Sequence, residues 1–191
     1  ESYAYNDDFS EVTIKLREGA KWSDGESVTS DDVVFTLNML KNNAPALGGW
    51  SVDAQTWVKD VQAVDPQTIK ISLTGPNPRY VFNEFGVRIY GTTFIVPAHI
   101  WEGQDPTTFS NFDLEKGWPV TSGPYQLVAS NDTETVWDRR DNWWAVDTGF
   151  KKQPAPERVI FRTAGSEERR TAMAINNELD TMWLMGRSTF E

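Results

Sequence analysis

The chain has 191 residues, with 18 Lys and Arg against 28 Asp and Glu, which gives a formal net charge of −10. This surplus of negative charge leaves no basic patch for a phosphate backbone or an anionic membrane surface, so it disfavours binding to nucleic acids and to membranes. The chain has no Cys, which excludes disulfides, thiolate catalysis and Cys-based zinc sites.

The first predicted unit is a strand, a compact turn and a helix. Apolar and polar residues alternate over 12–17, which predicts a half-buried strand. The turn that follows contains Asp24, whose side chain is expected to cap backbone amides. Thr29 is the expected N-cap of a helix that runs to residue 43, and Asp31 and Asp32 complement the dipole in its first turn.

The next segments alternate between loops and short strands. Gly, Pro and Asn predict a loop over 42–50. Two strands over 57–64 and 68–73 are expected to form a hairpin about the turn at 65–67. A short helix over 79–85 and an extended segment over 89–96 follow, and the chain from 98 to 112 is rich in loop-forming residues.

The last third predicts a second group of elements. A hairpin over 125–130 and 133–139 turns at Asn131 and Asp132, and 141–156 is expected to be a loop. A strand over 158–162, a helix over 166–176 with Ser166 as its N-cap, and a short strand over 179–184 complete the chain. These elements predict a mixed α/β protein whose sheets are not all parallel. The domains are expected to cover 1–116, a small α+β domain, and 117–191.

Four blocks span most of the chain; in chain order they are 22–33, 64–76, 121–125 and 139–180. Together they resemble the bacterial extracellular solute-binding proteins of family 5, the receptors of ABC importers for peptides and oligosaccharides. Two departures occur: Ser122 replaces the usual Thr, and Asn177 stands where Gly is common. Residues 97–101 and 143–150 resemble the oligosaccharide-binding branch more than the short-peptide branch.

The resemblance implies a type II periplasmic-binding-protein fold in which two lobes close on a solute. Because the family's mature receptors are much longer, this segment would hold the extra small domain and part of lobe one, and a signal peptide and anchor would lie upstream. The implied protein is periplasmic or extracellular, with a membrane-anchored lipoprotein as one option. It would bind a small-molecule solute, work with ABC permease subunits and need no cofactor. The isolated segment is expected to bind solute weakly because half of the cleft is missing.

Aromatic residues are the candidate ligand contacts, because a rigid ring stacks on a sugar or an apolar side chain at little entropic cost. Trp50 follows two glycines, Trp183 ends a predicted strand, and Trp57 begins one and is also a core candidate. His99 is the only histidine and no G-x-S-x-G motif accompanies it, so no catalytic triad or metal site is expected.

Adjacent carboxylates do not face each other on a helix, so no glycosidase pair is predicted and the chain is expected to be non-catalytic. Two alternatives stay open: a glycoside hydrolase or carbohydrate-binding module that uses the Trp side chains, and a purely structural or interaction domain.

Overall fold

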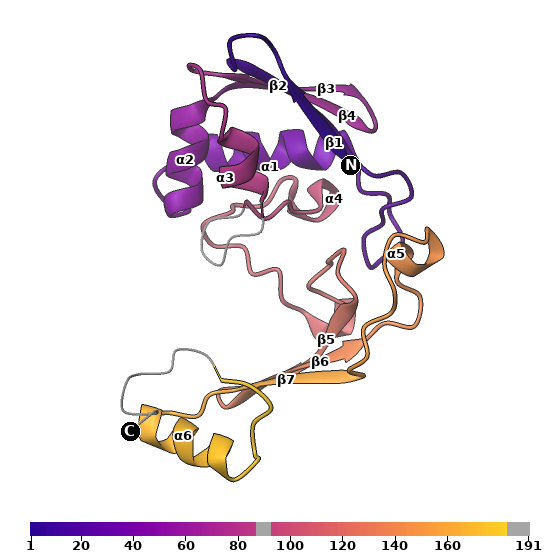
Figure 1. Ribbon diagram of the computed structural model, residues 1–191, viewed down its shortest axis with the longest axis vertical. Helices are drawn as coiled ribbons and strands as arrows, with labels where there is room; N and C mark the ends of the chain where they lie inside the picture. Colours follow the sequence, from indigo (N-terminus) through magenta and orange to yellow (C-terminus); the bar gives the residue numbers. More distant parts are fainter. Residues whose placement is uncertain (87–92, 183–191) are drawn as a thin grey trace. The chain divides into compact units, whose positions relative to one another are not determined.

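The computed structural model describes residues 1–86 and 93–182 (Figure 1). Contacts group the chain into two compact units. Unit 1 comprises Glu1–Pro124 and Arg140–Gln153, and unit 2 comprises Tyr125–Arg139 and the chain from Pro154 onward. The predicted division at residue 117 stays a prediction about the lobes of a larger protein, but residues 117–124 and 140–153 pack with the N-terminal residues.

Unit 1 is built on a four-stranded antiparallel sheet with the strand order β1-β2-β4-β3. Strands β1 (Ser2–Tyr5) and β2 (Glu11–Lys15) pair at one side, and β3 (Val58–Asp65) and β4 (Thr68–Leu73) form the predicted hairpin. Every second residue of β4 is buried, as its alternating pattern predicts. Strand β1 has no counterpart among the predicted elements.

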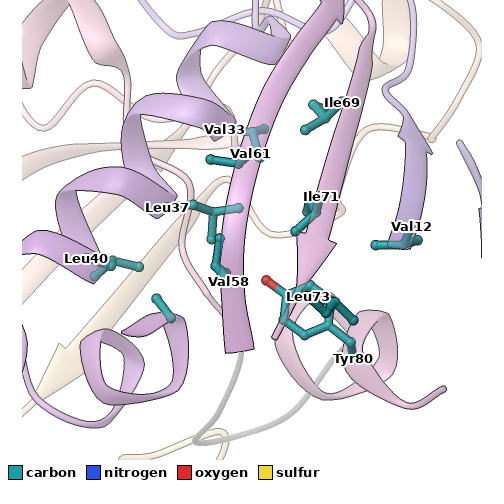
Figure 2. Close-up of a cluster of buried hydrophobic side chains, with 11 residues drawn as sticks. Val12, Val33, Leu37, Leu40, Val58, Val61, Ile69, Ile71, Leu73 and Tyr80 are labelled. Atoms are coloured by element: carbon teal, nitrogen blue, oxygen red, sulfur yellow. The ribbon is translucent and has the colours of Figure 1, made fainter. Parts of the chain in front are cut away.

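Helix α1 (Ser30–Asn42) lies against one face of this sheet and completes the core of unit 1 (Figure 1). Figure 2 shows Val33 and Leu37 of α1 pointing toward β3, where they meet Val58 and Val61. Burying a side chain of this size contributes about 1.5–3 kcal/mol relative to leaving it exposed. The other buried apolar residues of the core are Val12, Leu40, Ala54, Ile69, Ile71, Leu73 and Tyr80.

Short helices surround this core, and one of them corrects the sequence prediction. Helix α2 (Gly49–Trp57) occupies the end of the predicted 42–50 loop and the start of the predicted 57–64 strand. Trp57 therefore does not begin a strand; it is the last residue of α2. The positive φ of Gly48 (74°) turns the chain, the Ser51 hydroxyl donates to the Gly48 carbonyl at 2.7 Å, and Ala54 is buried in the core. Packing against α1 thus forms a helix where two glycines favour a loop.

The remaining elements of unit 1 are α3 (Tyr80–Phe85), α4 (Ala98–Trp101), the 3₁₀ turn η1 (Leu114–Lys116) and α5 (Trp144–Asp147). Helix α3 was predicted, whereas α4 and α5 fall in segments predicted to be loops. Of the predicted extended segment over 89–96, only 93–96 are described, and these residues form no strand. There the Val96 amide donates to the Thr36 hydroxyl at 3.0 Å, which ties the segment to α1.

Unit 2 consists of the antiparallel strands β5 (Tyr125–Ser130), β6 (Glu134–Arg139) and β7 (Arg158–Arg162), and of helix α6 (Glu167–Ile175). The Asn131 side chain accepts the amides of Thr133 and Glu134, which fixes the predicted turn. Ser166 caps α6, as predicted, by accepting the Arg169 amide at 3.4 Å.

The residues after α6 include one with a positive φ and no further strand among those described. Asn177 has a φ of 57°, a left-handed conformation that Gly and Asn adopt most readily, which explains why Asn can stand where Gly is common. Residues 179–182 form no strand, and the rest of the predicted 179–184 strand lies outside the described residues.

Candidate functional site

The buried carboxylate of Asp32 joins three segments of unit 1. One carboxylate oxygen accepts the indole N–H of Trp22 at 3.1 Å and the Thr29 amide at 2.9 Å. The other oxygen accepts the Ala98 amide at 2.8 Å and so fixes the start of α4. Asp32 is 4% exposed, so its role differs from that of its neighbour Asp31, which is exposed in the same first turn. The Trp22–Asp32 part of the sequence motif is therefore structural.

The turn after Trp22 is also closed by a carboxylate. One oxygen of Asp24 accepts the Glu26 amide at 3.2 Å, which confirms the predicted cap. The other oxygen lies 2.7 Å from Nε2 of His99, the only histidine of the chain. This contact adds a second tie between the turn and α4. Within residues 1–86 and 93–182, no group of three or more His, Asp and Glu side chains is placed to hold a metal ion.

A largely apolar cavity of about 210 Å³ lies between α1, α2 and the segment that carries α4; we call it the Trp50 cavity. Trp50 comes from the first turn of α2, and Trp101 ends α4. The N-cap Gly48 and the bond from Ser51 to its carbonyl set the start of α2 and hence the position of Trp50. The cavity is lined by Met39, Leu40, Leu47, Trp50, Phe94, Val96, Trp101 and Pro106.

Two exposed rings form the open part of the Trp50 cavity. The Trp50 ring meets Phe94 edge to face, with ring centroids 5.6 Å apart and an interplanar angle of 83°. Trp50 is 38% exposed and Phe94 is 69% exposed, so both present ring surface to solvent. Deeper in the wall, Trp101 packs edge to face on Phe109 at 4.9 Å. Such a surface can accept the C–H face of a sugar or an apolar peptide side chain.

The three predicted ligand contacts do not share one site among the described residues, and their role in binding stays a prediction. Trp50 lines the cavity. Trp57 is not among the lining residues; it is partly buried and packs against the hydrophobic core. Trp183 lies outside the described residues. Sequence reasoning did not assign Phe94 or Trp101 to a site. Trp101 entered only through the resemblance of residues 97–101, and Phe94 lies 44 positions after Trp50 (94 − 50) with no local signal beyond its aromatic ring.

The described part of the chain contains no helix that is both long and apolar enough to cross a lipid bilayer.

Comparisons with known proteins agree on one family. The model of the bacterial extracellular solute-binding proteins, family 5 middle region, matches residues 1–191. The probable peptide-binding protein YejA of Agrobacterium fabrum is 34% identical over 151 residues, which cover 77% of this chain and 23% of that protein. The glutathione-binding protein GsiB of Shigella flexneri is 26% identical over 180 residues, covering 93% of this chain and 31% of the relative.

A solved structure extends the similarity to the fold. The periplasmic oligopeptide-binding protein of a Thermotoga maritima ABC transporter, in complex with mannohexaose, has a TM-score of 0.74 and 28% identity. It matches 100% of this chain, which covers 33% of the solved protein. This chain therefore spans less than a third of the length of the curated relatives described above. The predicted mixed α/β fold of the type II periplasmic-binding-protein kind is confirmed. The chain belongs to family 5 of the bacterial extracellular solute-binding proteins.

Proposed function

We propose that this chain is part of a solute-binding receptor of an ABC importer, which captures peptides or oligosaccharides and does not transform them. The observation that carries this proposal is the family match over all 191 residues. The relatives support both ligand classes, since one is named as a probable peptide-binding protein and another is solved with mannohexaose. The proposed partners are the permease subunits of such an importer.

The Trp50 cavity supplies a surface that suits this role. Its wall is almost entirely apolar, and Trp50 and Phe94 expose their rings. A receptor needs a mostly apolar surface of this kind, completed by a few polar groups that fix the ligand. We propose that the remainder of the receptor supplies those polar groups and the opposite side of the cleft.

Exposed apolar residues of unit 2 also fit a chain that is part of a larger fold. On β7, Ile160 is 45% and Phe161 is 64% exposed, and on α6 Ile175 is 74% exposed. Such side chains on neighbouring elements are what further strands or helices of a lobe would cover. By the family's description, the proposed location is outside the cytoplasmic membrane, and a lipid anchor on the whole protein is part of the same proposal.

Two carboxylates of unit 1, Asp24 and Asp32, are bonded within the fold. The Asp32 carboxylate accepts hydrogen bonds from three N–H groups, and the Asp24 carboxylate is paired with His99. Neither carboxylate is left as a free acid or base for glycoside hydrolysis, which requires two carboxyl groups flanking one bond. Assaying the full receptor for turnover of cello-, manno- and xylo-oligosaccharides tests this point, and product release would refute it.

The test of solute binding uses the full-length receptor with peptides and with the same three kinds of oligosaccharide. A bound solute raises the melting temperature in proportion to RT ln(1 + [L]/Kd), so the correct solute gives a positive thermal shift. Trp50→Ala should then weaken binding about tenfold or more, as expected for an aromatic ligand contact. Phe82→Ala is the matched control, because Phe82 is 59% exposed and does not line the cavity.

The isolated 191-residue chain is the second arm of this experiment. It should give no thermal shift with any of the oligosaccharides, since most of the cleft is proposed to lie in the rest of the protein. A shift of several degrees with one sugar on the isolated chain would refute the shared cleft. Unchanged affinity of the Trp50→Ala receptor would refute the role of the Trp50 cavity.

A further inference from the structure

A second cavity of unit 1 has a different chemical character. Its volume is about 250 Å³, and it lies among the segments around residues 21–25, 121–123 and 140–147. All of these segments belong to unit 1. We call it the Arg140 pocket after the cation in its wall. Unlike the Trp50 cavity, it is lined mainly by polar side chains and by three indole rings, those of Trp22, Trp143 and Trp144.

The guanidinium of Arg140 is only partly hydrogen-bonded in this pocket. It has five N–H donors, and its one hydrogen bond within the described residues runs from Nη2 to the Thr121 hydroxyl at 3.2 Å. Its Nε is buried and has no hydrogen-bond partner among the described residues. Burial lowers the pKa of Arg140, and the negative charge of Asp24 only partly opposes this effect. A cation in this position is stabilised by an anionic partner.

The carboxylates of the pocket do not supply that partner. Both oxygens of Asp24 are occupied, one by the Glu26 amide and one by His99, and Asp24 forms no ion pair with Arg140. Asp147 is the other acidic residue of the wall; it is exposed and forms no ion pair within the described part of the chain.

The remaining polar groups leave a surplus of donors. The indole N–H groups of Trp143 and Trp144 are both used, since they donate to the Ser122 carbonyl at 3.0 and 2.8 Å. The ammonium of Lys21 lines the pocket and is without an ion-pair partner in residues 1–86 and 93–182. The Thr121 hydroxyl accepts from Arg140 and keeps its own proton available to donate. The pocket thus offers two cations and a hydroxyl donor to a ligand; of its two acidic side chains, Asp24 is bonded at both oxygens and Asp147 is exposed to solvent.

We propose that the Arg140 pocket binds the carboxylate group of a small ligand, either a simple organic acid or the C-terminus of a peptide. A carboxylate matches the planar fork of a guanidinium and accepts its N–H groups in pairs. Lys21 adds a second positive charge at the rim, and Thr121 adds a neutral donor. The site is complete within unit 1, so it does not depend on the proposed solute cleft or on the rest of the receptor.

The test is an NMR titration of the ¹⁵N-labelled 191-residue chain, which observes the Nε–H signal of Arg140 and the indole signals of Trp143 and Trp144. The probes are acetate, N-acetylglycylglycine and the neutral N-acetylglycylglycinamide, with NaCl at matched ionic strength as a blank. Both acids should give saturable shifts of these signals, and the amide and NaCl should not. Tighter binding of N-acetylglycylglycine than of acetate would identify a peptide terminus, and equal binding a simple acid.

Variants separate the pocket from general charge effects. Arg140→Gln should weaken the binding of both acids at least about tenfold, because it removes the charge-assisted hydrogen bonds to their carboxylates. Arg79→Gln is the matched control and should change nothing, since this exposed guanidinium lies over the Phe82 ring, outside the pocket. Lys21→Gln alters only an exposed side chain, so it tests the proposal without risk to folding; it should weaken binding about two- to fivefold.

Three results would overturn the proposal. The first is no saturable shift with either acid up to about 50 mM, the range in which weak binding is still measured. The second is equal binding of the neutral amide. The third is unchanged affinity in both Arg140→Gln and Lys21→Gln. None of these outcomes bears on the oligosaccharide arm of the solute test, which uses other ligands and the Trp50 cavity.

Discussion

Replacing Asp32 by Ala tests the strongest structural claim about unit 1. The substitution leaves three N–H donors without their acceptor: the Trp22 indole, the Thr29 amide and the Ala98 amide. Trp22 is only 6% exposed, so water does not readily replace the carboxylate at that donor. A hydrogen bond to a charged group contributes about 1.5–3 kcal/mol, and three bonds at the lower end of this range sum to about 4–5 kcal/mol.

After partial relaxation of the structure, Asp32→Ala should lower the free energy of unfolding by about 4 kcal/mol. This is a large part of the 5–15 kcal/mol that is typical of a folded domain. Urea unfolding followed by Trp fluorescence measures it. Asp31→Ala is the matched control, because Asp31 is exposed in the same turn and contributes only its interaction with the helix dipole, about 0.3–1 kcal/mol. If the two variants differed by less than about 1 kcal/mol, the three bonds would not stabilise the fold as described.

Three further substitutions test other parts of the structure. Burial raises the pKa of Tyr80 above its ordinary value of 10.0, so the free energy of unfolding should fall as the pH rises above 10. Urea midpoints compared at pH 9 and 11 measure this fall, and Tyr80→Phe should reduce it. The hydrogen bond from Arg158 lowers the pKa of Asp138 below its ordinary 3.8. The pair therefore stabilises unit 2 above that pH, and this stabilisation is lost as the pH falls and Asp138 is protonated. Arg158→Gln should flatten the acid side of a pH profile measured by circular dichroism. Ser30→Ala removes a buried hydroxyl that donates to the Asp65 carbonyl at 2.6 Å, and should cost about 1 kcal/mol in urea unfolding; no loss would show that this bond is not stabilising.

Local signals predicted much of the fold. The alternation in 68–73 gives β4, the apolar spacing after Thr29 gives α1, and the Ser166 cap gives α6. The turn at Asn131 also follows from one side chain that bonds its own neighbours. Each of these features depends on residues a few positions apart, so the sequence alone contains the physical cause.

Features that depend on distant contacts were missed. Helix α2 forms over the Gly48 turn because Ala54 is buried against the core, which the local sequence does not express. The bond from Ala98 to Asp32 joins residues 66 positions apart. For the same reason Trp101 was not linked to Trp50, although both line one cavity. Charge pattern alone also assigned Asp31 and Asp32 the same role, whereas burial separates them.

The path of the chain between the two units has a consequence for protein engineering. The backbone leaves unit 1 after Pro124, returns at Arg140 and leaves again after Gln153. A chimera that exchanged only residues 1–116 with a relative would therefore replace Ser23 and keep Thr121, whose amide donates to the Ser23 hydroxyl at 3.2 Å. Grafts that move 1–124 together with 140–153 preserve such native pairs, and they are the exchange that recombination of homologous receptors should tolerate best.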